Sequence, residues 1–227
     1  MKTFKNNEYH ISPSILACDF SELNEKFSQI HKAGLSYIHY DVMDNHFVPQ
    51  LTYGYKFVKD FNSKTPLLSD VHLMIDNPEE SIDKYIEAKS DILTFHIEAT
   101  DKKNIPGLIK KIHSAGIYTG ISIKPGTKVS EIEPYINDID MVLIMTVEPG
   151  FAGQSLIPEC IDKITELKEL VEKKSGNVII QCDGGINADN ISILYEKGCR
   201  FFVMGSAFFK QKNFVDFKKN IDNTLLK

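Results

Sequence analysis

The chain has 227 residues, of which 42% are hydrophobic and 25% are charged, and these proportions are ordinary for a globular domain. Its formal net charge of −5 argues against a general nucleic-acid-binding surface, which needs a dense basic face. The polar first ten residues lack the apolar core of a signal peptide, and no run approaches the roughly 18 apolar residues of a membrane span, so we expect a cytoplasmic protein that binds no membrane.

Short apolar runs alternate with longer amphipathic segments along the whole chain. The runs that predict strands are residues 11–17, 37–43, 67–74, 92–97, 118–123, 141–147, 178–182 and 201–204. The segments that predict helices are residues 21–33, 55–61, 78–88, 105–115, 129–136, 157–173, 188–197 and 214–226. Eight strand–helix units predict one α/β domain over residues 1–227, and their even spacing favours a (β/α)₈ TIM barrel over an open, doubly wound sheet.

Several residues mark the ends of the predicted helices. Asn77 is a plausible cap in front of Pro78, because proline is tolerated in the first turn of a helix. Gly34, Gly116 and Gly198 each follow a predicted helix, where a left-handed residue is favoured.

Ionisable side chains cluster where three predicted strands end. Side chains alternate along a strand, so His39 and Asp41 share one face, and His72 takes the equivalent place on the next strand. Asp183 ends the seventh strand, and the active site of a barrel forms at these strand ends. Two imidazoles and two carboxylates suit a divalent metal ion such as Zn²⁺, Fe²⁺, Mn²⁺ or Co²⁺.

Simpler explanations exist for each of these residues taken alone. A lone histidine on a strand is usually a hydrogen-bonded core residue, and an aspartate before two glycines usually belongs to a turn. Neither explanation accounts for the pattern as a whole, because ionisable groups inside a barrel are costly unless they are paired or bound to a metal.

Glycine-rich segments follow the last three strands, at residues 148–154, Gly184–Gly185 and Gly205–Ser206. Such loops let backbone N–H groups approach an anion closely, and barrels often bind phosphate there. The chain has a single arginine, Arg200, so we expect backbone N–H groups or lysines to hold any phosphate.

Methionines and cysteines complete the set of notable residues. Met43, Met74 and Met145 lie near strand ends and are candidates for an apolar wall of the site, with core filling as the alternative for each. The cysteines are Cys18, Cys160, Cys182 and Cys199. Their spacing fits no disulfide framework or metal motif, so we expect reduced, mostly buried side chains.

At this point several runs of the sequence resemble the ribulose-phosphate 3-epimerase family. These runs are residues 12–16, 39–44, 46–49, 70–74, 145–151 and 183–185, and they occur in order over essentially the whole chain. The resemblance implies metal-dependent 3-epimerisation of D-ribulose 5-phosphate to D-xylulose 5-phosphate through an enediolate, in the pentose phosphate pathway. It also implies a small sugar phosphate as ligand and assembly into a homodimer or hexamer.

The resemblance further assigns roles to individual residues. It implies that His39, Asp41, His72 and Asp183 bind one divalent metal ion, with Fe²⁺ or Zn²⁺ favoured over Mn²⁺ or Co²⁺. It implies that Asp41 and Asp183 form the acid/base pair. The residues that it places against the substrate are Ser14, His72, Gly150, Phe151, Ala152, Gly153, Gly184, Gly185, Gly205 and Ser206.

Three positions, Ala152, Asn45 and Gln50, depart from the family pattern, and the first keeps an alternative open; Gln50 replaces the usual asparagine after Pro49. Ala152 stands where a second glycine is usual, and it would be strained by about 1 kcal/mol if that position needs a positive φ. Alanine is also found there in the related allulose-6-phosphate 3-epimerases, so that activity is the first alternative. Asn45 replaces a common glycine, but asparagine tolerates left-handed geometry.

Two further rivals are less favoured. A decarboxylase of the orotidine-phosphate type needs a lysine within its Asp-x-Lys-x-x-Asp motif, and residues 39–44 contain none. A non-catalytic sugar-phosphate-binding relative would be expected to lack a ligand or an acid/base residue, whereas all four are present.

Overall fold

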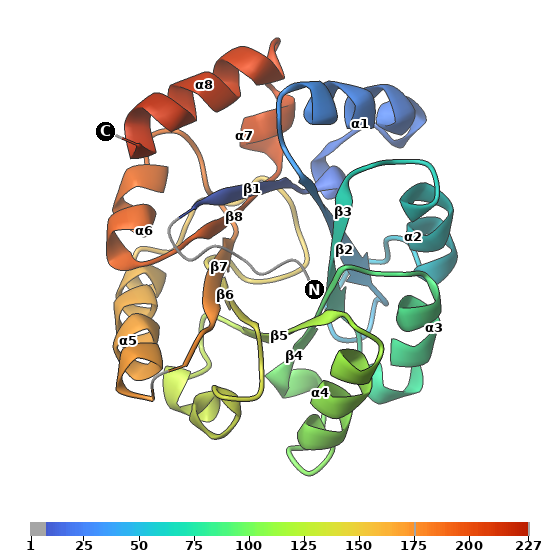
Figure 1. Cartoon of the computed structure of the whole chain (residues 1–227), viewed down its shortest axis with the longest axis vertical. Coiled ribbons are helices and arrows are strands. Elements are labelled where there is room, and N and C mark those ends of the chain that lie inside the picture. The colour runs from blue at the N-terminus through green and yellow to red at the C-terminus, as the bar shows by residue number, and fades with distance from the viewer. Residues whose placement is uncertain (1–7, 175, 227) are drawn as a thin grey trace.

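The computed structural model describes residues 8–174 and 176–226, and these residues contain eight parallel strands that form a barrel (Figure 1). The strands are β1 His10–Pro13, β2 Tyr37–Met43, β3 Leu68–Met74, β4 Ile92–His96, β5 Tyr118–Ile123, β6 Met141–Met145, β7 Ile179–Asp183 and β8 Phe201–Met204. Hydrogen bonds join them in the order β1-β8-β7-β6-β5-β4-β3-β2. The predicted TIM barrel is confirmed. The predicted polar N-terminal end includes residues 1–7, which lie outside the described residues. The predicted single domain over residues 1–227 also includes residues 175 and 227, which lie outside them too.

Helices surround the barrel on its outer face (Figure 1). The α-helices are α1 Leu23–Lys32, α2 Tyr55–Asn62, α3 Ile82–Glu87, α4 Ile105–Ser114, α5 Glu159–Lys173, α6 Ile191–Lys197, α7 Ser206–Phe209 and α8 Phe214–Leu225. Short 3₁₀ helices are η1 Ile15–Ala17, η2 Phe20–Glu22, η3 Pro78–Glu80, η4 Ile97–Ala99, η5 Val129–Glu131 and η6 Glu133–Tyr135. No helix of the described residues is both long and apolar enough to span a membrane.

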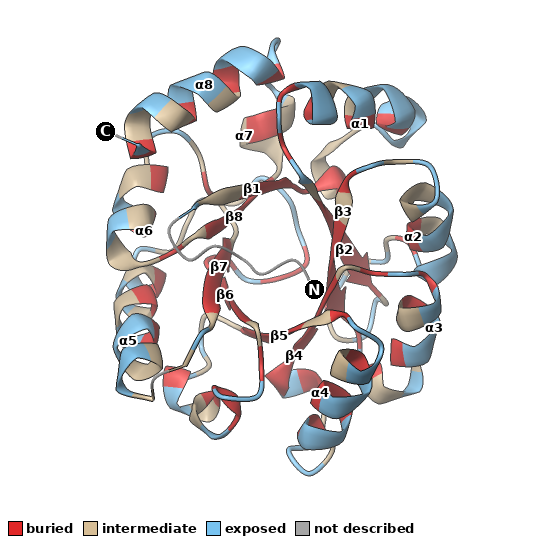
Figure 2. Ribbon diagram, viewed as in Figure 1, coloured by how far each residue is buried: buried red, intermediate tan, exposed pale blue. Residues whose placement is uncertain are grey.

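The two faces of each strand differ in chemistry because side chains alternate between the helices and the barrel interior. On β2, the fully buried Ile38 and Tyr40 belong to the main hydrophobic core, to which residues of the surrounding helices also contribute (Figure 2). The alternate residues His39 and Asp41 are equally buried but polar. The main core therefore lies between the barrel and its helices, while the interior holds polar residues together with smaller apolar clusters, one of which consists of Ile92, Met141, Ile179 and Phe201.

Some predicted elements differ from the observed ones. The run 11–17 is a strand only to Pro13, and its second half is apolar because Ile15 is buried within η1 rather than because the strand continues. The predicted helix 129–136 is two 3₁₀ turns, since Pro134 cannot donate the backbone hydrogen bond that a continuous helix needs. The short helix α7 was not predicted.

The predicted helix ends are correct at three glycines, and Asn77 stands at the predicted N-cap position without a capping hydrogen bond from its side chain. Gly34, Gly116 and Gly198 have φ values of 76°, 76° and 125°. Asn77 does occupy the position before Pro78, but it has a left-handed backbone and its side chain makes no capping hydrogen bond.

The barrel closes between β1 and β2 through a single parallel bridge, which joins Ser14 to His39. Beyond this bridge the backbone of β2 is hydrogen-bonded by side chains instead of a neighbouring strand. Asp41 N–H donates to the hydroxyl of Tyr53, and the hydroxyl of Thr52 donates to the Asp41 carbonyl. Local side chains thus replace the strand pairing that β1 is too short to supply.

The cysteines are free, as expected. Cys160, Cys182 and Cys199 are buried and Cys18 is partly buried, in keeping with their predicted role as small core residues.

Two glycines should respond oppositely to substitution by alanine. A Cβ on Gly120 of β5 would lie 2.2 Å from Thr94 Oγ1 and 3.0 Å from its Cβ, so Gly120→Ala should lower the free energy of unfolding by about 1–3 kcal/mol. Gly107 in the first turn of α4 has no atom within 4 Å of that position, so Gly107→Ala should raise it by up to about 1 kcal/mol. Urea unfolding monitored by circular dichroism measures both, and equal effects of the two substitutions would contradict this account of the packing.

Candidate active site

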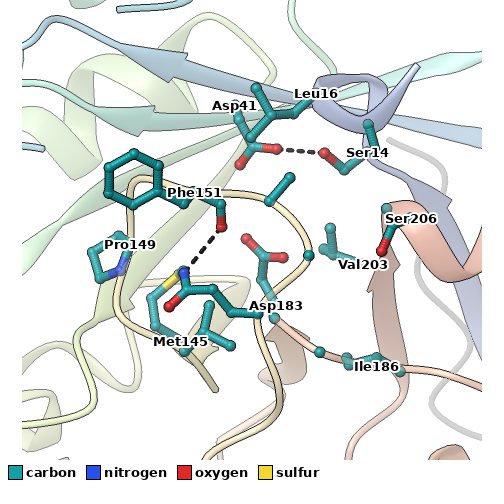
Figure 3. Close-up of a pocket in the computed structure, with 18 of the residues that line it drawn as sticks. Ser14, Leu16, Asp41, Met145, Pro149, Phe151, Asp183, Ile186, Val203 and Ser206 are labelled. Atoms are coloured by element: carbon teal, nitrogen blue, oxygen red, sulfur yellow. Dashed lines mark hydrogen bonds between the residues drawn. The ribbon is translucent and has the colours of Figure 1, made fainter. Parts of the chain in front are cut away.

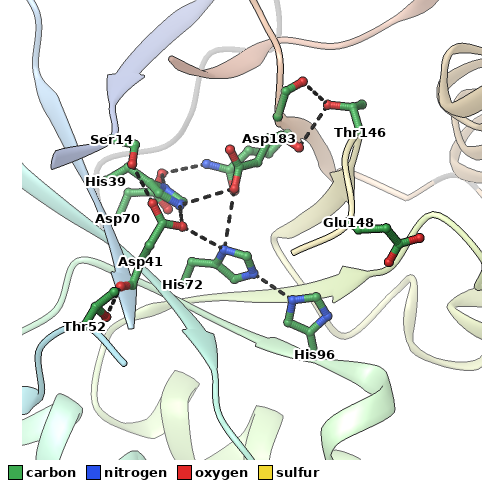
Figure 4. Close-up of polar contacts among 12 residues, drawn as sticks. Ser14, His39, Asp41, Thr52, Asp70, His72, His96, Thr146, Glu148 and Asp183 are labelled. Atoms are coloured by element: carbon green, nitrogen blue, oxygen red, sulfur yellow. Dashed lines mark hydrogen bonds and ion pairs between the residues drawn. The ribbon is translucent and has the colours of Figure 1, made fainter. Parts of the chain in front are cut away.

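Four side chains meet inside the barrel, toward the carboxyl ends of the three strands that carry them. His39 and Asp41 lie on β2, His72 lies on β3, and Asp183 is the last residue of β7. The strand register pairs Asp41 directly with His72. One ligand atom from each of the four lies within 4.8 Å of the other three (Figure 4). The fold therefore brings together the cluster that the sequence predicted.

The nitrogen atoms that face this cluster have carboxylate neighbours but no hydrogen bonds. His39 Nε2 lies 3.3 Å from Asp41 Oδ1 and 3.9 Å from Asp183 Oδ2. His72 Nδ1 lies 3.5 Å and 3.7 Å from the same two oxygens. Neither nitrogen has a hydrogen-bond partner among the described residues, which is costly for a buried polar atom. Ligands about 2.1 Å from a tetrahedral ion are themselves roughly 3.4 Å apart, so this His/Asp group could hold a divalent metal ion.

The second nitrogen of His39 is held by a buried hydrogen-bond network. His39 Nδ1 lies 2.7 Å from Asp70 Oδ2, which also accepts a hydrogen bond of 2.6 Å from Gln181 Nε2. All three side chains are fully buried. A carboxylate only accepts hydrogen bonds, so Nδ1 carries a hydrogen, and Nε2 is the nitrogen that can offer a lone pair to a metal ion once its own proton has left.

The second nitrogen of His72 contacts another histidine. His72 Nε2 lies 2.9 Å from His96 Nε2, and His96 Nδ1 lies 3.0 Å from Glu98 Oε2. Burial lowers the pKa of His96 to about 4 despite the hydrogen bond to Glu98, so this imidazole is neutral. Burial raises the pKa of Glu98, but its contacts with His96 outweigh this and bring the pKa to about 2.

The two carboxyl groups of the cluster have opposite protonation preferences. Burial disfavours the Asp41 carboxylate, but the neighbouring His39 and His72 outweigh burial and hold the pKa of Asp41 well below its usual value. Burial, and then the negative charge of Asp41, raise the pKa of Asp183 to about 8. At neutral pH and without a metal ion, Asp41 is therefore ionised and Asp183 is protonated. The hydroxyl of Ser14 donates to Asp41 Oδ2 at 2.5 Å and orients that carboxylate.

A cavity of about 150 Å³ opens beside the cluster, and both Asp41 and Asp183 line it (Figure 3). The other predicted site residues that line it are Ser14, Met43, Met74, Met145, Gly150, Phe151, Ala152, Gly153, Gly184, Gly185, Gly205 and Ser206. His39 and His72 are fully buried and do not reach the cavity wall. Arg200 lies away from the cavity, at the start of β8, where its guanidinium donates to the carbonyls of Tyr195 and Cys199.

Two glycines allow the loops around the cavity to pack closely. Gly184 and Gly185 have φ values of 121° and 67°, which side chains rarely adopt. A Cβ on Gly184 would lie 2.4 Å from the side chain of Val147, and one on Gly185 would lie 2.2 Å from the backbone nitrogen of Leu156. The sequence Asp183-Gly184-Gly185 thus permits β7 to end against the loop that follows β6.

The structure removes the concern about strain at Ala152. Gly150 and Gly153 have positive φ, whereas Ala152 does not. Alanine is therefore compatible with this loop, and Asn45 has the left-handed φ of 60° that asparagine tolerates.

No role was predicted for two residues that contact the cluster from behind. Asp70 shares a face with His72, and Gln181 shares one with Asp183, so strand alternation indicates that both point into the barrel. The contact between His72 and His96 could not be found in this way, because it depends on how the β3 and β4 side chains are rotated.

Comparisons with known proteins agree with the geometry. The model of the "Ribulose-phosphate 3 epimerase family" matches residues 10–209. A ribulose-phosphate 3-epimerase of Mycobacterium bovis is 43% identical over 202 residues, which are 88% of this chain and 85% of the relative. One of Bacillus subtilis is 38% identical over 204 residues, covering 89% of this chain and 93% of the relative.

Among solved structures, 3-hexulose-6-phosphate synthase from Salmonella typhimurium aligns with a TM-score of 0.70 at 15% identity, covering 96% of this chain and 98% of that one. This similarity concerns the barrel fold alone.

Metal affinity should depend on pH if the cluster binds a metal ion. The ion needs Asp183 ionised and His39 Nε2 unprotonated. The pKa of Asp183 is raised to about 8, and although burial lowers that of His39, Asp70 and Asp41 raise it well above its usual value. Protons must therefore leave on binding, so the apparent association constant for Zn²⁺ should rise at least about tenfold per pH unit between pH 6 and 8. Competition with a chromophoric chelator measures this slope.

The variant Asp183→Asn is the control, because it removes one titrating group and should give a shallower slope. A pH-independent affinity in the unmodified protein would contradict the assignment of these protons.

Proposed function

The chain belongs to the ribulose-phosphate 3-epimerase family of isomerases, and we propose that it interconverts D-ribulose 5-phosphate and D-xylulose 5-phosphate with the aid of one divalent metal ion. The observation that carries the proposal is the convergence of two buried histidines and two aspartates, of opposite protonation preference, beside the cavity.

We assign His39, Asp41, His72 and Asp183 as the metal ligands. Two ring nitrogens without hydrogen-bond partners among the described residues face two carboxylate oxygens, and this donor set suits Fe²⁺ or Zn²⁺, with Mn²⁺ and Co²⁺ as alternatives. When bound, such an ion stabilises the negative charge that develops on the enediolate.

Epimerisation at C3 needs one group to remove a proton and another to return a proton to the opposite face. Asp41 and Asp183 line the same cavity but come from β2 and β7, between which β1 and β8 lie. Without a metal ion their environments lower the pKa of Asp41 and raise that of Asp183, whereas a bound ion would favour the carboxylate form of both, so each could take up a proton from C3. The Ser14 hydroxyl keeps the Asp41 carboxylate oriented toward the cavity (Figure 3). Ser14 is also placed to contact the sugar.

We assign the phosphate to backbone N–H groups of the loops after β7 and β8. Gly184, Gly185, Gly205 and Ser206 line one part of the cavity, and these small residues allow close approach of a phosphate. The loop at residues 150–153 lines another part and would cover the sugar, while Met43, Met74 and Met145 would form an apolar wall.

The pentulose phosphate is the preferred substrate because curated relatives at 36–43% identity are named ribulose-phosphate or ribulose-5-phosphate 3-epimerases. Allulose 6-phosphate remains the alternative that Ala152 raises. The non-catalytic alternative is disfavoured, since both acid/base candidates line the cavity. Cytoplasmic location, a role in the pentose phosphate pathway and assembly into a dimer or hexamer stay predictions.

Loss of either carboxylate should stop epimerisation. Asp41→Asn and Asp183→Asn should each lower kcat by about 10²–10⁴-fold at saturating metal, because amides cannot exchange the proton. Conversion of ribulose 5-phosphate measured by a coupled assay, with metal content determined on the same samples, tests this. Asp189→Asn, an exposed position at the start of the α6 region, is the matched control and should be unaffected.

Proton exchange in D₂O sharpens the test. Each variant should still exchange the C3 proton of one epimer without converting it, and the two variants should act on opposite epimers. Turnover within tenfold of the unmodified protein in either metal-loaded variant would contradict the two-carboxylate scheme.

Substrate preference has its own test. At equal metal content, kcat/KM should be at least tenfold higher for ribulose 5-phosphate than for allulose 6-phosphate, because the additional carbon must be accommodated between the same metal ligands and phosphate loops. A higher value for allulose 6-phosphate would assign the chain to the alternative activity.

A further inference from the structure

We propose that Glu98 and His96 are positioning residues that fix the tautomer of His72 and thereby leave its Nδ1 free to bind a metal ion. This inference rests on the proposed metal site, but it concerns two residues that do not belong to the ligand set.

His72, His96 and Glu98 form a continuous series of contacts that leads from the buried site to the partly exposed Glu98, and Figure 4 shows its first two members. The rings of His72 and His96 pack with their centroids 4.9 Å apart, and their Nε2 atoms are 2.9 Å apart. His96 Nδ1 then contacts Glu98 Oε2 at 3.0 Å. Both imidazoles are fully buried, where a second proton on either ring would be costly. In each contact, therefore, one atom donates and the other accepts.

Glu98 decides the direction of these hydrogen bonds. Its Oε1 accepts from the backbone N–H of Lys124 at 2.7 Å and from the hydroxyl of Thr127. Its Oε2 faces His96, and a carboxylate oxygen can only accept. The hydrogen of His96 therefore lies on Nδ1, and His96 Nε2 must accept from His72. His72 then carries its hydrogen on Nε2, and its Nδ1 lone pair points at Asp41 and Asp183.

The loop that donates to Glu98 is itself fixed. The ammonium group of Lys163 on α5 donates to the carbonyls of Lys124, Pro125 and Thr127 at 3.1, 2.5 and 2.5 Å. Because these carbonyls are held, the Lys124 N–H keeps its orientation toward Glu98. The tautomer of His72 is thus determined by contacts that extend to α5.

His39 shows the same principle in a shorter form. Asp70 contacts His39 directly, whereas Glu98 acts on His72 through His96. Partners behind ligating histidines typically contribute 10–100-fold to metal affinity. Both histidines of the cluster thus have a carboxylate behind them.

The substitution Glu98→Gln tests the proposal because it preserves shape but changes one acceptor into a donor. The Lys124 N–H can only donate, so the amide oxygen must take the Oε1 position and the NH₂ group must face His96. This would move the His96 hydrogen to Nε2 and the His72 hydrogen to Nδ1, where it competes with a metal ion. We expect Zn²⁺ affinity, measured by chelator competition, to fall about 10–100-fold.

Asp140→Asn is the matched control. Asp140 Oδ2 accepts from a backbone N–H, that of Thr119, and contacts His113 Nε2 at 2.8 Å, so it resembles Glu98 but has no contact with the site. This variant should keep the Zn²⁺ affinity of the unmodified protein even if its melting temperature falls. An equal loss of affinity in both variants would indicate general destabilisation and overturn the proposal.

A spectroscopic measurement tests the tautomers without any metal. In ¹⁵N-histidine-labelled, metal-free protein, long-range ¹H–¹⁵N correlation should show His96 protonated on Nδ1 and unprotonated on Nε2, and His72 protonated on Nε2. The reverse assignment for His96 would overturn the proposal even if Glu98→Gln does not fold. Absence of Zn²⁺ binding by the unmodified protein would instead overturn the proposed metal site, and the ¹⁵N assignment would still decide the tautomers.

Discussion

Two imidazoles and two carboxylates come together inside the barrel, and the rest of the structure must offset the free-energy cost of burying them. Ionisable groups in such an environment must be paired, hydrogen-bonded or bound to a metal. His39 and His72 each use one nitrogen for a partner behind the site and direct the other at the carboxylates. This arrangement orients the lone pairs, but it also leaves Asp183 beside the charge of Asp41, which with burial raises its pKa to about 8. A site poised in this way is a source of instability that the scaffold must offset.

The stabilisation that offsets this cost comes from apolar side chains on the other face of the same strands. Residues such as Ile38, Tyr40 and Phe95 alternate with the polar ones and are fully buried within the main core, together with residues of the helices. A layer of apolar side chains that includes Met141 and Phe201 lies near the amino ends of the strands. Strand alternation thus places most of the apolar packing on the side that faces the helices, while the ionisable cluster lies inside the barrel.

Much of this could be predicted from the sequence, because periodicity and spacing are local signals. The β2 and β3 motifs gave the correct face for His39, Asp41 and His72, and the order of the strands brought Asp183 to them. The errors arose where composition is ambiguous: Ile15 is apolar within a 3₁₀ turn, and the segment around Pro134 has the apolar spacing of a helix but cannot form one. The run from His96 to Glu98 resembles the family, but its contacts could not be predicted, because side-chain rotation and loop contacts, such as that of Lys124 with Glu98, are not encoded in any short pattern.

The gap between β1 and β2, called the seam below, lies beside the site and affects it. Among the described residues, one backbone bridge spans this gap, from Ser14 just after β1 to His39, and the hydrogen bond from the Ser14 side chain to Asp41 crosses the same gap. Separation of the strands here would move Ser14 away from Asp41, so opening of the barrel would also disrupt the proposed site. By thermodynamic linkage, a ligand that binds the cluster only in the closed barrel stabilises the closed barrel. Stronger pairing at the seam would in turn raise the affinity of the cluster for that ligand. Ligand affinity at the cluster and the stability of the closed barrel therefore depend on each other.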